Sequence, residues 1–163
     1  DEKNYRWMLA NALCGRANGY NSAGQFSQAI ADCVQCGSLS IELGDQAGEL
    51  RSQYILGGFY YQLGKHEENL RLALAGQRRA DDLVAELNYL LPFYNLRAWS
   101  LSALGFQETA VACQHEAVKM AIETKSLRLI AYAYIYQGRT YAKRGWFAQA
   151  VASAHAVLIL GGN

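Results

Sequence analysis

Four glycines divide the chain at nearly equal intervals, and the residues around them repeat the same order of small and large side chains. The glycines are Gly24, Gly64, Gly105 and Gly145, spaced 40, 41 and 40 residues apart. Seven residues before each glycine stands a small residue, and four before it stands a large one: Ala17, Gly57, Ala98 and Gly138, then Tyr20, Tyr60, Leu101 and Tyr141. This regular period indicates one supersecondary unit repeated four times.

Small residues also recur on the other side of each glycine. They stand five and twelve residues after it: Ala29, Asn69, Ala110 and Ala150, then Cys36, Gly76, Ala117 and Val157, of which only Asn69 is polar. Small residues at matching points of two helices let their backbones approach closely, while the large residue fills the groove between successive pairs. The pattern predicts antiparallel helix pairs, with each glycine in the left-handed conformation that ends the first helix.

The period predicts where the helices lie. The first helices of the pairs are expected near 4–22, 46–63, 86–104 and 127–144, and the second helices near 26–43, 66–82, 107–124 and 147–160. Pro92 falls early in the third of the first helices, where it predicts a late start or a bend because proline lacks a backbone donor.

The order small residue, two residues, Tyr, three residues, Gly, four residues, Ala resembles the tetratricopeptide repeat over essentially the whole chain. The period is similar to that of the longer variant of about 40 residues found in bacterial regulators and signalling adaptors, not the common 34. The family's frequent early Trp is replaced by Leu13, Gln53, Tyr94 and Tyr134, and its proline after the second helix is absent.

The resemblance implies an all-α, right-handed α-solenoid of about four antiparallel helix-turn-helix repeats. We expect a single domain, 1–163, with repeats at about 4–43, 46–82, 86–124 and 127–160. The chain starts at Asp1 and stops just after the apolar run 157–160, so we expect a fragment of a longer protein.

The resemblance also implies that the first helices line a concave groove. The stripe of candidate partner-binding residues is Asn11, Asn18, Asn21, Arg51, Tyr54, Tyr61, Asn95, Trp99, Ser102, Tyr132 and Arg139. Such residues supply amide hydrogen bonds, aromatic contacts and recognition of carboxylates, with Arg51 and Arg139 clamping acidic groups of the ligand. The alternative for any single tyrosine is packing between neighbouring helices. If the polar members are exposed together in the groove, binding is favoured.

These residues predict a protein or peptide ligand, with an acidic one favoured. Another possibility is a small-molecule or signal-peptide sensor of a bacterial regulator, and a closed aromatic pocket near Tyr54, Tyr61 and Trp99 would favour it. A third is self-association through the apolar end helix 147–160.

Composition and charge narrow the function classes. Fifteen Lys and Arg against fourteen Asp and Glu leave no electrostatic footprint for nucleic acid or anionic lipid. No apolar run is long enough to span a bilayer and no signal segment opens the chain, so we expect a cytoplasmic protein without a membrane partner. A hydrophobic content of 52% is enough for a core that folds without a cofactor.

The sequence predicts neither a catalytic site nor a metal site. Cys33 and Cys36 have the spacing of a redox or zinc half-site, but no second pair or nearby His follows, so Cys36 is predicted to be a small core residue. Cys14 and Cys113 are predicted to be reduced thiols, and no disulfide is expected. Without a Ser-His-Asp order, a carboxylate pair or a phosphate loop, the chain is predicted to be non-catalytic.

Overall fold

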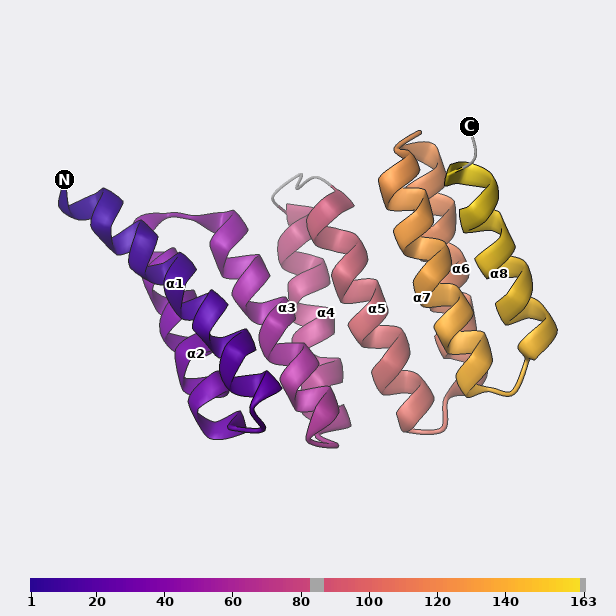
Figure 1. Ribbon diagram of the computed structural model, residues 1–163, viewed down its shortest axis with the longest axis horizontal. Coiled ribbons are helices and arrows are strands. Elements are labelled where there is room, and N and C mark those ends of the chain that lie inside the picture. The colour runs from indigo at the N-terminus through magenta and orange to yellow at the C-terminus, as the bar shows by residue number, and fades with distance from the viewer. Residues whose placement is uncertain (83–86, 162–163) are drawn as a thin grey trace.

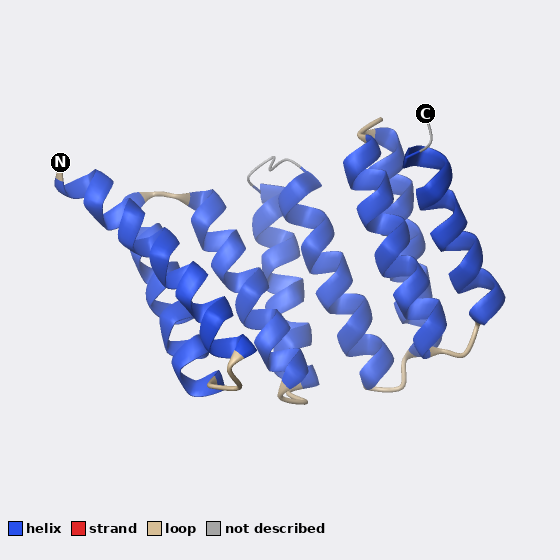
Figure 2. Cartoon of the chain, in the orientation of Figure 1, coloured by secondary structure: helices blue, strands red, loops and turns tan. Residues whose placement is uncertain are grey.

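The computed structural model describes residues 1–82 and 87–161, which form eight α-helices and no strand (Figures 1 and 2). The helices are α1 Glu2–Ser22, α2 Phe26–Leu43, α3 Gln46–Gln62, α4 His66–Asp82, α5 Leu87–Ala103, α6 Gln107–Glu123, α7 Leu127–Lys143 and α8 Phe147–Gly161. The all-α prediction is confirmed, and the helix ends lie within two residues of those expected. The expected start of the fifth helix, at 86, lies outside the described residues.

The helices are arranged as a curved stack of hairpins (Figure 1). Each first helix packs against its own second helix, and α1, α3, α5 and α7 also contact one another in turn along the stack. No two of the second helices α2, α4, α6 and α8 make such a contact over the described residues. The layer whose members lie closer together is on the inside of the curve, so the first helices line the concave surface.

Each repeat glycine ends a first helix in the left-handed conformation. Gly24, Gly64, Gly105 and Gly145 have φ values of 74°, 73°, 91° and 80°. The N–H of the next residue donates to the carbonyl of the large residue four before the glycine, as in Trp146 to Tyr141 at 2.9 Å. This is the closing bond of a Schellman motif, in which the same two side chains often touch. The rings of Tyr141 and Trp146 lie 5.9 Å apart, so the glycine and the large residue belong to one turn.

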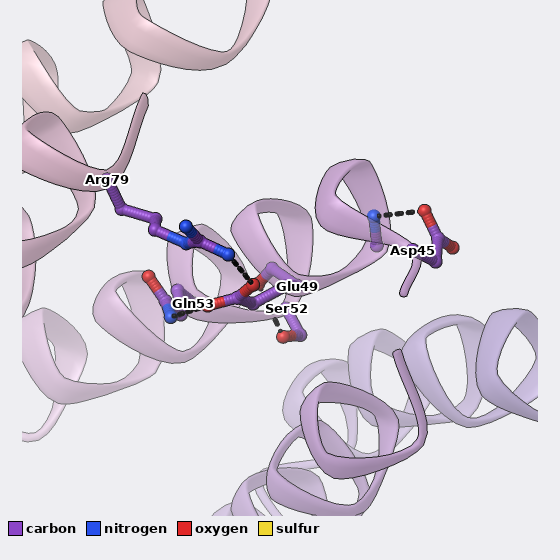
Figure 3. A network of polar contacts seen from close by, with 6 residues as sticks. Asp45, Glu49, Ser52, Gln53 and Arg79 are labelled. Atoms are coloured by element: carbon purple, nitrogen blue, oxygen red, sulfur yellow. Dashed lines mark hydrogen bonds and ion pairs between the residues drawn. The ribbon is translucent and has the colours of Figure 1, made fainter. Parts of the chain in front are cut away.

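Polar contacts fix the second hairpin at its open end (Figure 3). Asp45 caps α3 by accepting from the N–H of Gly48 at 2.9 Å. Glu49, one turn later, accepts from Arg79 of α4 at 3.3 Å and from the amide of Gln53 at 3.4 Å. The ion pair therefore joins α3 to α4 near the end opposite the glycine turn.

Small residues bring the helices of repeats two and three close together. A Cβ on Gly57 would lie 2.5 Å from a methyl of Leu96, and a Cβ on Gly76 would lie 2.2 Å from the ring of Phe93. Leu96 and Phe93 are completely buried in the cluster that joins α3, α4 and α5. The repeat interface thus depends on the absence of these two methyl groups.

The expectation that all four cysteines are reduced is wrong for one pair. Cys14 of α1 and Cys36 of α2 form a disulfide, with their Cα atoms 6.0 Å apart. They stand ten residues before and twelve after Gly24, so the antiparallel hairpin places them opposite each other. Cys36 is a buried small residue as predicted, but it is bonded across the hairpin, while Cys33 and Cys113 are free and buried.

The late start expected at Pro92 does not occur, because α5 is described from Leu87 and continues through the proline. Its neighbours Leu90, Leu91 and Phe93 are buried against adjacent helices. Tertiary burial on both sides of the proline offsets the loss of one helical hydrogen bond. None of the described helices has the length and apolar character needed to cross a bilayer.

Candidate functional site

A row of aromatic rings connects α4 and α3, through α5, to α7. Going along the row, ring centroids are separated by 5.1 Å, 5.5 Å, 5.3 Å and 4.5 Å. The rings, in that order, belong to His66, Tyr61, Trp99, Tyr136 and Tyr132. These spacings are those of favourable edge and tilted aromatic contacts, so the five rings form one packed cluster, in which Tyr136 is buried and the others are half-buried.

Two cations of α7 lie against this aromatic row. The ammonium of Lys143 is 4.4 Å from the ring centroid of Tyr61 and 6.0 Å from that of Trp99, and it also donates to the Tyr61 hydroxyl. The guanidinium of Arg139 is 5.4 Å from the ring centroid of Tyr136. Neither cation is in an ion pair with a carboxylate in the described part of the chain.

A pocket of about 460 Å³ opens on the concave surface between these side chains. We call it the inner pocket; it is lined by Gly58, Tyr61, Gln62, Trp99, Arg139, Ala142 and Lys143. Three successive first helices contribute to it, because Gly58, Trp99 and Arg139 all stand six residues before their repeat glycines. The repeat thus builds one site from three equivalent positions.

Three tyrosine hydroxyls meet beside the inner pocket and connect α3 to α7. Tyr136 donates to Tyr132 at 2.7 Å, and Tyr54 of α3 is hydrogen-bonded to both. Burial, followed by the hydrogen bonds within the cluster, raises the pKa of Tyr54, and burial raises that of Tyr132 to about 12. The raised pKa values keep the hydroxyls of Tyr54 and Tyr132 protonated at neutral pH.

The predicted stripe is only partly brought together. Tyr61, Trp99 and Arg139 line the inner pocket. Tyr54 and Tyr132 are half-buried in the hydroxyl cluster beside it. Arg51 lies elsewhere, so the structure does not place it with Arg139 in one clamp.

Of the three asparagines of α1 in the predicted stripe, Asn11 and Asn18 are held by hydrogen bonds within the protein. Asn11 donates to the carbonyl of Trp7 at 3.0 Å and accepts from Arg51, which joins α1 to α3. Asn18 is exposed and donates to the carbonyl of Cys14 at 3.1 Å, within the same helix. Asn21 has a buried side-chain oxygen without a hydrogen-bond partner.

Asn95 and Ser102 were expected in the groove, and this placement is wrong. Asn95 is 1% exposed and accepts from Gln114 of α6 at 3.3 Å, so it belongs to the packing between the helices of the third repeat. Ser102 is also buried, and it donates to Gln107 at 3.0 Å across the α5–α6 turn. The repeat position alone therefore does not decide whether a side chain is exposed, because contacts with the partner helix bury Asn95 and Ser102.

Lys143 and Gln62 line the inner pocket but were missing from the predicted stripe. Both stand two residues before their glycines. Lys143 also follows Arg139 by four residues, so the two lie on one face of α7. This four-residue spacing from Arg139 is the sequence signal that would have added Lys143 to the predicted stripe.

The structure gives no support for metal or thiol chemistry in the Cys33–Cys36 segment. Within the described ranges no group of three His, Cys, Asp or Glu side chains is placed to hold a metal ion. Burial, with a smaller contribution from Asp32, raises the pKa of Cys33 to about 12, so this thiol is not activated.

Comparison with known proteins identifies the fold. No family model and no curated protein sequence matches the chain. Among solved structures, the chain is similar to a Rap protein crystallised in complex with competence and sporulation factor, with a TM-score of 0.78 and 16% identity. The similarity covers 99% of this chain and 44% of that one, so this chain spans less than half of that Rap protein's length. The chain has the fold of a tetratricopeptide-like helical repeat protein.

Proposed function

We propose that the chain is a non-catalytic binding module that holds an acidic peptide segment in its concave groove, with the inner pocket as the main contact. The observation that carries the proposal is the combination, in one pocket, of an aromatic wall from Tyr61 and Trp99 with two cations that have no carboxylate partner among the described side chains. Aromatic and arginine side chains are the residue types that dominate binding energy at interfaces. The pocket lies between three repeats, where an extended chain would cross successive first helices.

The chemistry of the pocket sets the kind of ligand. Arg139 and Lys143 would bind a side-chain or terminal carboxylate through charge-assisted hydrogen bonds. An apolar or aromatic side chain next to that carboxylate would pack on Trp99. A ligand with a carboxylate would also replace the hydroxyl of Tyr61 as the partner of Lys143.

The proposal is tested by selecting peptides from a random seven-residue display library on the full chain and measuring their affinities by calorimetry. We expect selected peptides to be acidic, and the double variant Trp99→Ala and Arg139→Ala to bind them at least about 100-fold more weakly, from about 1.4 kcal/mol or more per contact. Arg71→Ala and Arg78→Ala, exposed on α4, form the matched control and should leave affinity unchanged. Selection of no peptide, or equal affinity for both double variants, would contradict the proposal.

A second candidate is a sensor of a small molecule or signalling factor. The Rap protein of the same fold was crystallised with competence and sporulation factor, so a solenoid of this kind is able to hold such a factor. The inner pocket, at about 460 Å³, lies within the range of small-ligand sites. However, it is open to the groove, which favours an extended peptide over an enclosed small molecule.

A further inference from the structure

The C-terminal end of the stack carries an apolar groove that no described residue covers. The groove has a volume of about 420 Å³ and lies between α7 and α8. It is lined by Tyr134, Ile135, Gly138, Arg139, Ala142, Ala150, Ala154, Val157 and Leu158. Helix α8 packs only against α7, and its Phe147, Val151 and Leu158 are 69%, 54% and 72% exposed.

The inner repeats bury the positions that this end face exposes. Thirteen residues after the glycine, Gln77 and Val118 are each 7% exposed, whereas Leu158 at the same position is 72% exposed. Nine residues after the glycine, Cys33, Ala73 and Gln114 are buried, whereas Ala154 is exposed. The end face is therefore a repeat interface whose partner helix is lacking among the described residues.

The three inner interfaces show what fills such a groove. In each, the next first helix inserts side chains from positions twelve, nine and five before its glycine. These sets are Ser52, Ile55 and Phe59, then Phe93, Leu96 and Ser100, then Ala133, Tyr136 and Thr140. All nine are buried or half-buried, and every set holds at least one large apolar or aromatic side chain.

The N-terminal end face of a second copy does not supply a matching helix. The equivalent positions of α1 are Ala12, Gly15 and Gly19, which are exposed. A Cβ added to Gly15 or Gly19 would find no atom within 4 Å. This flat face has no side chain to insert into a groove of about 420 Å³. The two ends of the stack are thus unequal, and only the C-terminal end presents a site for insertion.

We propose that the α7–α8 end face docks one amphipathic helix of a partner protein, which runs parallel to α7 and inserts large apolar side chains spaced three and four residues apart. The site is continuous with the three inner interfaces and repeats their geometry. It is separate from the peptide-binding proposal, although Arg139 and Ala142 line both pockets, so neither residue is used to test it.

The probe is a labelled, helix-stapled peptide with the sequence of residues 46–62, which presents Ile55 and Phe59 at this spacing. Binding to the full chain is followed by fluorescence anisotropy. We expect binding to the wild type, and a loss of at least about tenfold with Leu158→Lys and with Ala154→Glu, because each places a charge in the groove. The control Ile41→Lys changes an exposed apolar residue of α2 outside the groove, and should bind like the wild type.

A probe with Ile55→Lys and Phe59→Lys should not bind, because it lacks the inserting side chains. The idea is overturned if the original probe does not bind the wild type, or binds Leu158→Lys and Ala154→Glu equally well. Light scattering gives the remaining outcome. A concentration-dependent dimer that Leu158→Lys abolishes would identify a second copy as the occupant and overturn the assignment to a separate amphipathic helix.

Discussion

At the scale of single residues, Asn69 is the exception in the repeat pattern. It is completely buried in α4, and neither polar atom of its amide has a hydrogen-bond partner among the residues that the structure describes. The other repeats have alanine at this position. Burying an unpaired amide costs about 1–3 kcal/mol, which exceeds the packing that its few side-chain atoms contribute.

Asn69→Ala is therefore expected to increase the free energy of unfolding by about 1 kcal/mol. Urea denaturation followed by circular dichroism measures the change. The reverse substitution Ala110→Asn places the same amide in the third repeat and should destabilise. If Asn69→Ala lowers the denaturation midpoint, the amide has a partner in solution.

The Arg16–Asp32 pair predicts a pH dependence of stability. Arg16 donates two hydrogen bonds to the buried carboxylate of Asp32, at 2.7 Å and 2.8 Å, and the pKa of Asp32 is lowered, mainly by this bonding. A carboxyl with a lowered folded pKa stabilises the protein above its unfolded pKa of about 3.9 and loses this effect as pH falls through the folded pKa.

Asp32→Asn should therefore be less stable than the wild type at neutral pH, and the difference should close below about pH 4. Thermal unfolding from pH 2 to pH 7 measures it. Glu67→Gln removes an ion pair with Arg71 whose side chains are about 70% exposed, and serves as the control with little effect at any pH. If the stabilities of the wild type and Asp32→Asn differ by the same amount at every pH, the pH dependence does not come from Asp32.

At the scale of helices, the contact between α4 and α5 depends on Gly76. The other second helices carry Cys36, Ala117 and Val157 at this position, but here the ring of Phe93 occupies the space of a side chain. Gly76→Ala should lower the free energy of unfolding by about 1–3 kcal/mol, because the buried ring must move.

A double-mutant cycle with Phe93→Leu tests this, since the smaller side chain should make Gly76→Ala much less harmful. The matched control is Gly15→Ala, also a glycine in the interior of a helix but with nothing near its Cβ. It should stabilise by about 0.5–1 kcal/mol through helix propensity. Equal losses for Gly76→Ala with and without Phe93→Leu would show that the ring is not the obstacle.

The elements themselves could be predicted because their signals are local. A left-handed glycine and the large residue four before it belong to one turn, so their spacing fixes where each first helix ends. Of the two expectations at Pro92, the late start is wrong, because the burial of Leu91 and Phe93 depends on helices distant in sequence, while the bend stays a prediction. The disulfide follows from the hairpin register once the positions of Cys14 and Cys36 relative to Gly24 are compared, a comparison that the search for motifs along the chain omits.

At the scale of the whole molecule, the stack is held by contacts between neighbours. Helix α8 contacts only α7 among the described helices, whereas α1 is joined to α2 by a disulfide and also contacts α3. In such a linear array, the end with the fewest neighbours opens most easily.

Hydrogen exchange followed by mass spectrometry should therefore find the fastest amide exchange of the described helices in α8. Reducing the disulfide should accelerate exchange in α1 and α2 while leaving α7 and α8 unchanged, which separates the two ends. Slower exchange in α8 than in α1 under oxidising conditions would contradict this order.

The candidate site could be predicted only in part. Its location follows from the repeat fold, but the residues that line it depend on contacts between individual side chains. The repeat phase placed Tyr61, Trp99 and Arg139 on the inner surface. It could not tell that Asn95 is buried against α6, because that burial depends on a contact with Gln114, a residue of another helix. Nor could it tell that Lys143 reaches across to Tyr61 of α3, a contact between residues 82 positions apart.

Trp99 can serve as a fluorescent reporter, because it lies between side chains of α3 and α7. Its indole lies between Tyr61 and Tyr136, with the ammonium of Lys143 nearby, so its emission depends on the same side chains that hold the two helices together. The chain has three tryptophans, and Trp7 and Trp146 lie outside the inner pocket. With those two replaced by phenylalanine, the emission maximum and lifetime of Trp99 would report ligand binding in the groove. No added dye would be needed.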